Sequence, residues 1–434
     1  MLQSQIINAL PRRILAKLWA SKETRISLSH LQLIQTSSNH KQNMPLATTP
    51  SFLCSELPIR YTHLLRLLST QTAETLQSPV IKHIAHQYLH DICTLLHPSL
   101  LATSPRAFTD VLCRLRQRQA ASLIRLRYAL LYTPTAASVA LLENMQTIGF
   151  GIHQIIDQHV AWATHSRSTC KTNRVQSTCA VAIARQAAEN ARSALRTSLG
   201  DDIPSIHIKQ QSDTIPFTFA PQVLHRILYE TMTIALRANI MQQRLQSRSW
   251  RDVWKRWWPR SSHENALDVH VFGGPTSVGF KLDSRTPLLH GDLLQDIPRD
   301  AIGIPTCASV LSRTKSDQLS SDDDDSLPDL ECEVHNGWRS AKLLASHWGG
   351  NLDAISIDGL GTTMYLALDR DTSLLERYPS RWTSTQNTAL SLSNATAQLD
   401  AFLYAISDPQ QIHQYQPFKH DHHAVSLSAA VGHA

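Results

Sequence analysis

The stretch VLHRILYETMTIALRAN, residues 223–239, sets the pattern for the second half of the chain. Its apolar residues recur at spacings of three and four, which predicts an amphipathic helix with one face in a core. Glu230 and Ile234 stand four residues apart and therefore share one face of that helix. Taken by themselves, Glu230 and His225 are typical of solvated helix positions, whereas Ile234 extends the apolar face that includes Ile227.

Short β-like runs alternate with helical patterns on both sides of this helix. IHIKQ precedes it, and LDVHVF, SVGFKL, the helical RSAKLLASHW, NLDAISID and TTMYLALD follow it. This alternation predicts an α/β sandwich, a sheet with helices on one face, over residues 199–372.

Two insertions interrupt the α/β region, and a polar tail follows it. The first, near 244–264, interleaves tryptophans with arginine and lysine; it can stack on bases, lie at lipid headgroups or pack on the domain as a surface insertion. The second, near 315–335, is an acidic run that we expect to stay solvated. The tail, residues 373–434, is rich in Ser, Thr, Gln and His, and its KHDHH could bind a metal only adventitiously, so we assign no metal site.

The first half of the chain has a helical pattern. Apolar residues recur at three and four in YTHLLRLLST, VIKHIAHQYLHDICTLL, AFTDVLCRLRQRQAASLIRLRYALLY and NMQTIGFGIHQIIDQHVAWA. Prolines separate these stretches at Pro79, Pro98, Pro105 and Pro134. Long helices joined by short turns predict an antiparallel four-helix bundle over residues 51–198.

Residues 1–50 have the composition of a targeting segment. They contain several basic residues and a single acidic one, Glu23, and they are rich in Ser, Thr and Gln. IINALPRRILAKLWA could form a basic amphipathic helix, which is typical of a mitochondrial presequence; a disordered basic tail is the alternative. We therefore predict a location in the mitochondrial matrix.

The overall composition is that of a globular chain. Its 434 residues are enough for two domains, and 42% are hydrophobic and 18% charged. Seven scattered cysteines without CxxC spacing argue against a disulfide framework and against a zinc site. The net charge of +6 is concentrated at the N-terminus and in one insertion, so we predict no nucleic-acid partner. An uninterrupted apolar run of about 18 residues is missing, so we predict no transmembrane segment.

The order of these segments resembles the mitochondrial 2-oxoacid dehydrogenase kinases, which include the pyruvate and branched-chain ketoacid dehydrogenase kinases. The resemblance covers about residues 57–372. Gln158 and His159 match a Gln-His pair at the end of the family's helical domain. The matching blocks are LPIRYTHLLRLL, RLRQRQAASL, HQIIDQHVAWA, LHRILYETMTIALRA, SVGFKLDSRTPL and NGWRSAKLLASHWGGNLDAISIDGLGTTMYLAL.

The resemblance implies a fold and an activity. The fold is a helical bundle followed by a nucleotide-binding domain of the type found in histidine kinases, gyrase, Hsp90 and MutL. Such kinases bind ATP with Mg, dock on the lipoyl domain of the 2-oxoacid dehydrogenase complex, and phosphorylate a serine of the dehydrogenase subunit. Family members also pair through the sheet, so we expect a homodimer, or a heterodimer with an active paralogue.

Five candidate residues follow from this resemblance on or near the central helix and the strand after it. Glu230 matches the acid that takes the proton from the attacking hydroxyl, and His225 matches a histidine that neighbours this acid. Arg237 matches a position close to the phosphates. Asp283 stands at, or one place from, the acid that binds the adenine amino group, and Ile234 replaces the asparagine that holds the magnesium ion.

The remaining candidates are glycines and a threonine. Gly337 is all that remains of the family's glycine-rich lid, and an acidic run that would repel a triphosphate precedes it. Gly359, Gly361 and Thr362 match the Gly-x-Gly-Thr entry to the last strand, where the threonine joins the water network around adenine. In the helical half, Gln119 replaces a histidine.

Two functions compete at this point. The first is a mitochondrial protein-serine kinase that transfers the ATP γ-phosphate to a serine of the pyruvate or branched-chain dehydrogenase subunit. The alternative is a catalytically impaired pseudokinase, a binding or regulatory subunit, because Ile234 offers magnesium no ligand and the glycines after Asp283 and before Gly337 are missing. A misread exon boundary near 313–337 would explain the acidic run but not Ile234.

Overall fold

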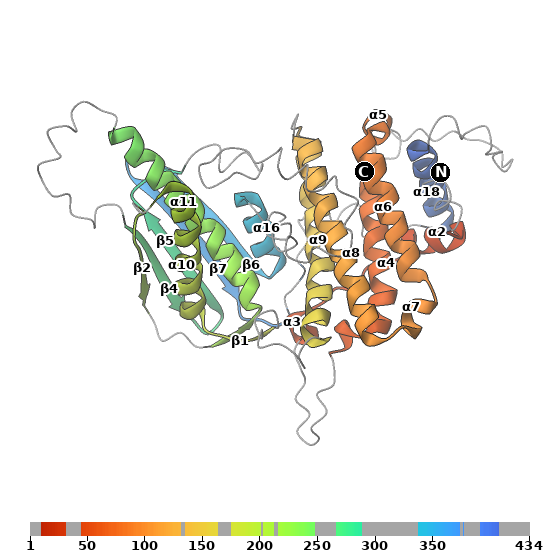
Figure 1. Ribbon diagram of the computed structural model, residues 1–434, viewed down its shortest axis with the longest axis horizontal. Helices are drawn as coiled ribbons and strands as arrows, with labels where there is room; N and C mark the ends of the chain where they lie inside the picture. Colours follow the sequence, from red (N-terminus) through yellow and green to blue (C-terminus); the bar gives the residue numbers. More distant parts are fainter. Residues whose placement is uncertain are drawn as a thin grey trace, which may run out of the picture. The chain divides into compact units, whose positions relative to one another are not determined.

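The structure is a computed structural model (Figure 1). By their contacts, the residues divide into a helical unit, Met1–Thr24, Thr49–Ile152 and Pro379–Ala434, and an α/β unit, Arg25–Thr48 and His153–Tyr378. This mixture of helices and sheet agrees with the predicted α + α/β class. The residues that the structure describes are 10–31, 45–131, 135–163, 175–200, 203–211, 216–247, 266–288, 337–373, 376 and 391–407.

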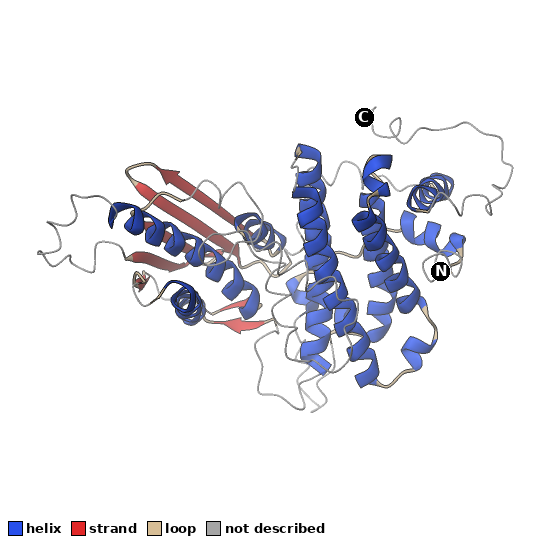
Figure 2. Ribbon diagram, turned by 45° about the horizontal axis from the view of Figure 1, so that its top comes forward, coloured by secondary structure: helices blue, strands red, loops and turns tan. Residues whose placement is uncertain are grey.

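Long helices make up most of the helical unit (Figure 2). Pro50, Pro79 and Pro105 each open one of them, a position where the missing N–H is no loss and the fixed φ favours the helix. The helices of this unit are α2 (Arg12–Ala20), α4 (Pro50–Leu68), α5 (Ala73–Gln77), α6 (Pro79–Leu96), α7 (Ser99–Ala102), α8 (Pro105–Leu131), α9 (Ala136–Ala163, as far as Ile152) and α18 (Leu392–Ile406).

Helices α6 and α8 run antiparallel. Nε2 of His83 lies 2.8 Å from Nη1 of Arg125, and Nδ1 of His90 lies 3.3 Å from Nη1 of Arg118, so the two pairs run in opposite order along the chain. Arg118 also binds the fully buried Asp91 at 2.9 Å. Removal from water raises the pKa of Asp91, although Arg118 and His90 oppose that effect.

The N-terminal helix α2 is part of the core of the helical unit. Leu15 and Trp19 are at most 1% exposed. The Trp19 ring lies 5.9 Å from the ring of Phe402 in α18, and Arg12 forms an ion pair with Asp400 of the same helix at 3.0 Å. Helix α2 therefore packs as part of the helical unit.

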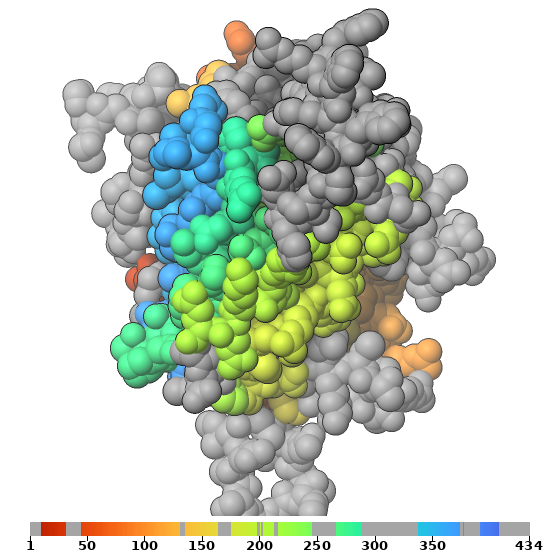
Figure 3. All heavy atoms as spheres, turned by 90° about the vertical axis from the view of Figure 1, so that its left-hand side faces the viewer, coloured from red at the N-terminus to blue at the C-terminus, as the bar shows by residue number. Residues whose placement is uncertain are grey.

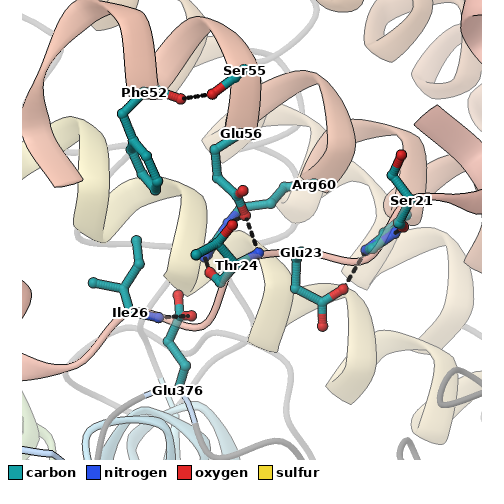
Figure 4. A network of polar contacts seen from close by, with 10 residues as sticks. Ser21, Glu23, Thr24, Ile26, Phe52, Ser55, Glu56, Arg60 and Glu376 are labelled. Carbon is teal, nitrogen blue, oxygen red and sulfur yellow. Dashed lines mark hydrogen bonds and ion pairs between the residues drawn. The ribbon is translucent and has the colours of Figure 1, made fainter. Parts of the chain in front are cut away.

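A polar network fixes the residues that follow α2 (Figure 4). Oε1 of Glu56 accepts hydrogen bonds from Arg60 Nε at 3.0 Å and from the Thr24 backbone N–H at 2.9 Å. Arg60 in turn donates to the carbonyl of Thr24 at 2.8 Å. Glu23 contacts His63 at 2.9 Å, and only 9% of the Glu23 side chain is exposed.

This network predicts an acid-sensitive contribution to stability. Burial alone would raise the pKa of Glu23, but the hydrogen bond and charge of His63, with a backbone hydrogen bond and Arg60, lower it to about 2 from its usual 4.5. A lowered carboxyl pKa stabilises the fold above the unfolded-state value, and that stability is lost as the pH falls through the folded-state value.

We expect Glu23→Gln to lower the free energy of unfolding at pH 6 by roughly 3 kcal/mol, and the deficit to shrink between pH 4.5 and about 2. Chemical denaturation of the full chain across this range measures it. The matched control is Glu74→Gln, because Glu74 is an exposed glutamate on α5. An equal deficit in the two variants would contradict the expectation.

The α/β unit contains a five-stranded sheet in the order β2-β4-β5-β7-β6. Strand β2 is parallel to β4, and the other neighbours are antiparallel. The strands are β2 (Ile206–Gln210), β4 (Leu267–Gly273), β5 (Ser277–Ser284), β6 (Gly350–Ile357) and β7 (Gly361–Asp369), with a separate pair β1 (Gln176–Thr178) and β3 (Phe217–Phe219). The helices are α10 (Ala180–Leu199), α11 (Pro221–Ser247), α16 (Trp338–His347), α3 (Leu28–Leu31) and the 3-10 turn η1 (Leu46–Thr48).

Among the described residues of this unit, the long helices lie on one face of the sheet (Figure 1). Along β5 the buried residues alternate with more exposed ones, so Leu282 and Ser284 face the helices while Asp283 faces away. On the open face, Ile355 is 58% exposed and Tyr365 is 45% exposed. Strands β4 to β7 form a continuous exposed surface there, in teal and blue in Figure 3.

The remaining N-terminal residues belong to the α/β unit. Ile26 donates its backbone N–H to Oε2 of the buried Glu376 at 2.8 Å (Figure 4), and Ser29 donates its own to the carbonyl of Thr372 at 3.1 Å. His159 Nδ1 lies 2.7 Å from the carbonyl of Thr48.

Several predicted segments lie outside the described residues. These are the 315–335 insertion, the 244–264 insertion apart from its first residues in α11, and most of the 373–434 tail. Within the described ranges, every helix is too short or too polar to cross a membrane.

Candidate functional site

Helix α11 places Glu230 beside the start of α16. Glu230 is 7% exposed, and its two carboxylate oxygens have different partners. Oε1 forms an ion pair with Arg226 at 2.7 Å, and Oε2 accepts the backbone N–H of Gly337 at 3.2 Å. Gly337, with φ at +100°, is the residue that caps the N-terminus of α16, where a carboxylate is stabilised by the helix dipole. Glu230 therefore links α11 to the start of α16 through its hydrogen bond with Gly337.

Ile234 lies in the core, one turn after Glu230. It is 3% exposed, and its neighbours Ala235 and Leu236 are fully buried. Magnesium binds oxygen ligands in a strict octahedral geometry, and an isoleucine side chain has no oxygen to offer. Among the described residues, no group of three His, Cys, Asp or Glu side chains could hold a metal ion. The residues present here therefore do not fit a magnesium ion held from α11.

His225 does not share a face with Glu230. Five residues along a helix correspond to a rotation of roughly 140°, and His225 instead contacts Asn190 of α10, with 3.0 Å between Nε2 and Nδ2. Its ring also stacks on Tyr229, with centroids 6.1 Å apart. Burial lowers the pKa of His225, and the positive charge of Arg226 lowers it further.

Arg237 stands two turns after Glu230 and is 8% exposed. Seven residues are close to two full helical turns, so both charged side chains share one side of α11. Of the α11 residues that match the family, Glu230 and Arg237 therefore lie on the same side of the helix.

Asp283 lies on the open face of the sheet, away from α11. Its carboxylate forms an ion pair with Lys281 at 2.8 Å and accepts the hydroxyl of Thr363 at 2.8 Å. The hydrogen bond from Lys281 to Asp283 raises the pKa of Lys281. The residue at the end of β5 that faces the helices is Ser284, whose hydroxyl donates to Oδ1 of Asn239 in α11 at 2.9 Å.

Thr362, at the start of β7, pairs in register with Ser284 and is 3% exposed. Its hydroxyl donates to the carbonyl of Thr286 at 2.9 Å and lies 2.9 Å from the hydroxyl of Ser356 in β6. Thr362 thus lies in a buried cluster of hydroxyl groups, together with Ser284, Thr286 and Ser356.

The two matched glycines before Thr362 differ in their surroundings. Gly359 has φ at +80° and an open environment, because a Cβ built on it meets nothing within 4 Å. Gly361 has φ at +108°, and a Cβ there would lie 2.2 Å from the carbonyl oxygen of Ser284. Gly361 therefore allows close backbone approach, whereas Gly359 only makes a turn.

The sequence interpretation missed Ser284, Asn239, Thr286 and Ser356. The strict alternation of apolar residues in SVGFKLDS could have shown that position 284, and not 283, shares the buried face with Leu282. Nothing in the sequence indicates that Asn239 meets this position. Gln119 is fully buried in α8 of the helical unit.

Two comparisons relate the chain to known proteins. Residues 26–181 match a family model described as mitochondrial branched-chain alpha-ketoacid dehydrogenase kinase. Over 233 residues the chain is 24% identical to the mitochondrial [pyruvate dehydrogenase (acetyl-transferring)] kinase of Arabidopsis thaliana, and the matched part covers 53% of this chain and 57% of that relative. Both matches are to mitochondrial 2-oxoacid dehydrogenase kinases, the family that the sequence resembles.

Proposed function

We propose that this protein acts at a mitochondrial 2-oxoacid dehydrogenase complex as a catalytically impaired regulatory member of its kinase family. The observation that carries the proposal is Ile234, a fully packed apolar side chain on the α11 face that also presents Glu230. Phosphoryl transfer depends on positioning and on neutralising phosphate charge, so the loss of a metal ligand removes several kcal/mol of stabilisation.

The engagement of Glu230 supports the same proposal. A general base must accept a proton from a positioned hydroxyl, and here one oxygen is paired with Arg226 while the other accepts the Gly337 N–H. Freeing Oε2 breaks the contact with the start of α16, and freeing Oε1 breaks the ion pair with Arg226 within α11.

We propose that the helical unit is the antiparallel four-helix bundle of the family and that the α/β unit is its histidine-kinase and Hsp90-type domain. The antiparallel pair α6 and α8 and the one-sided sheet support these assignments. On this basis the partners are the dehydrogenase subunit and the lipoyl domain, in the mitochondrial matrix. The open face with Ile355 and Tyr365 would serve a homodimer or a heterodimer with an active paralogue.

The second candidate is an active protein-serine kinase that uses ATP. The retention of Glu230 and Arg237 on one side of α11, with Thr362 at the start of β7, favours it. In that case Glu230 would take the proton of the substrate serine. His225 is close to Glu230 in the sequence but lies on another face of α11, where it contacts Asn190.

An assay of phosphate transfer separates the two candidates. The full chain is incubated with purified pyruvate or branched-chain dehydrogenase complex and radiolabelled ATP with magnesium. We expect no more labelling of the dehydrogenase subunit than with Glu230→Gln, while the chain still co-purifies with the lipoyl domain. Labelling by the full chain that Glu230→Gln abolishes would establish the active kinase instead.

A further inference from the structure

Residues 25–31, which we call the strap, are an N-terminal segment that packs in the α/β unit. Its three buried apolar side chains are Ile26, Leu28 and Leu31. Its backbone binds the residues that follow β7. The Ser29 N–H donates to the carbonyl of Thr372 at 3.1 Å, and the Ile26 N–H donates to Oε2 of Glu376 at 2.8 Å (Figure 4). The strap is therefore held both by apolar burial and by two backbone hydrogen bonds.

Glu376, the residue that binds the strap, has a strained backbone. Its φ is +54°, and among the described residues it is the one residue other than glycine with a positive φ. A residue with a Cβ adopts that region at an energetic cost and keeps it only where the surroundings hold it. Glu376 is buried, and its carboxylate accepts the Ile26 N–H while its own N–H donates to the carbonyl of His347 at 2.9 Å. The strap thus helps to hold Glu376 in its strained conformation.

Helix α16 receives a hydrogen bond at each end from this part of the unit. His347 is its last residue, and the last carbonyls of a helix need partners from outside it, here the N–H of Glu376. At the other end, the Gly337 N–H donates to Oε2 of Glu230 at 3.2 Å. The ten residues of α16 span roughly 15 Å and form one rigid element, so a change at one end reaches the other.

We propose that the strap and Glu376 form a conformational switch that controls the contact between α16 and Glu230. In the docked state, Ile26 holds Glu376 at positive φ, and the N–H of Glu376 caps the end of α16. When the strap leaves, Glu376 returns to negative φ and its N–H turns away from His347. Helix α16 then shifts and the Gly337 N–H leaves Oε2 of Glu230, which becomes available to another donor. The switch concerns the state of Glu230 and holds for either candidate function.

Amide hydrogen exchange of the full chain, resolved to single residues, tests the switch. In the unaltered chain we expect the amides of Ile26 and Gly337 to exchange slowly. Glu376→Ala removes the acceptor of the Ile26 N–H and keeps a Cβ that disfavours positive φ. We expect it to accelerate exchange at Ile26 at least about tenfold and at Gly337 at least about threefold.

Glu376→Gly separates the switch from a simple loss of contact. It removes the same acceptor, but glycine adopts positive φ without steric cost, so the N–H of residue 376 stays on the His347 carbonyl. We expect Ile26 exchange to accelerate as in Glu376→Ala, while Gly337 stays protected. The matched control is Asp371→Ala, which removes an exposed carboxylate of the same segment and should leave both amides unchanged.

If Glu376→Ala does not fold, Ile26→Ala releases the strap from its own side. We expect Gly337 exchange to accelerate at least about threefold in Ile26→Ala and to slow again in Ile26→Ala/Glu376→Gly. Amides of the paired strands β5 and β7 report the integrity of the sheet, and we expect them to keep their exchange rates in every variant.

Four results would overturn the switch. They are fast exchange at Ile26 in the unaltered chain, unchanged exchange at Gly337 after the strap is released, equal acceleration at Gly337 in Glu376→Ala and Glu376→Gly, and acceleration of the β5 and β7 amides by the same factor as Gly337. Each is a measurement of exchange and none is a measurement of phosphate transfer, so the proposed function is tested separately.

Discussion

Deletion of residues 1–24 is expected to leave the helical unit largely unfolded at 25 °C. The deletion removes Leu15 and Trp19, whose burial against α18 contributes about 1.5–3 kcal/mol or more each, and the partner of His63. It also exposes the apolar side of α18, where Leu399 and Phe402 are fully buried. The summed loss approaches the whole stability of an ordinary domain, which is about 5–15 kcal/mol.

The matched control for this deletion is removal of residues 1–9 alone, which precede the described structure. Thermal unfolding followed by circular dichroism compares both truncated chains with the full chain. We expect the shorter deletion to leave the transition unchanged and the longer one to abolish it. An unchanged transition after deletion of residues 1–24 would show that α2 is dispensable.

Gly361→Ala is expected to destabilise the α/β unit strongly, because Gly361 combines a positive φ with a close approach to Ser284 and Arg285. The added Cβ would meet the Ser284 carbonyl at 2.2 Å, so the pairing of β5 with β7 at this point must break. Alanine at φ +108° adds backbone strain of about 1–2 kcal/mol. We expect a total loss of about 4 kcal/mol or more.

Gly359→Ala is the control for this substitution. Its backbone strain is comparable, with φ at +80°, but no atom lies within 4 Å of the added Cβ. We expect it to cost only about 1–2 kcal/mol. Urea denaturation of both variants measures the difference, and equal losses would mean that the close approach of β7 to Ser284 is not a constraint on the fold.

The pattern of apolar residues was enough to predict the mixed fold and its elements. VLHRILYETMTIALRAN does form a helix with Ile227 and Ile234 buried, because a 3.6-residue period fixes which side chains share a face. The strands LDVHVF and SVGFKL occur as β4 and β5 for the corresponding reason, a period of two.

The composition of the first 50 residues was a weaker guide. A basic amphipathic helix is typical both of a presequence and of a terminal helix that buries one face. The structure adds a hydrogen bond from Trp19 to Gln398, at 3.3 Å and 379 residues apart. A contact over that separation leaves no local signal in the sequence.

The details of the candidate site also depend on contacts between residues that are far apart in the sequence. Asp283 matched the adenine-binding acid by residue type, yet the strand alternation turns it to the open face and turns Ser284 toward α11. The hydrogen bond between Ser284 and Asn239 joins residues 45 apart in the chain. The pairing of Glu230 with Arg226 was within reach of the sequence, because an acid and a base four residues apart on a helix attract each other.

Calorimetry of the full chain determines whether this site holds ATP with magnesium. ATP is titrated into the protein with and without magnesium, and an active member of the family serves as the positive control. We predict no magnesium-dependent heat of binding from the full chain, since the side chain at position 234 is an isoleucine and offers the ion no oxygen ligand. Tight ATP binding that requires magnesium would rule out the impaired nucleotide site and make Glu230 the candidate general base of an active kinase.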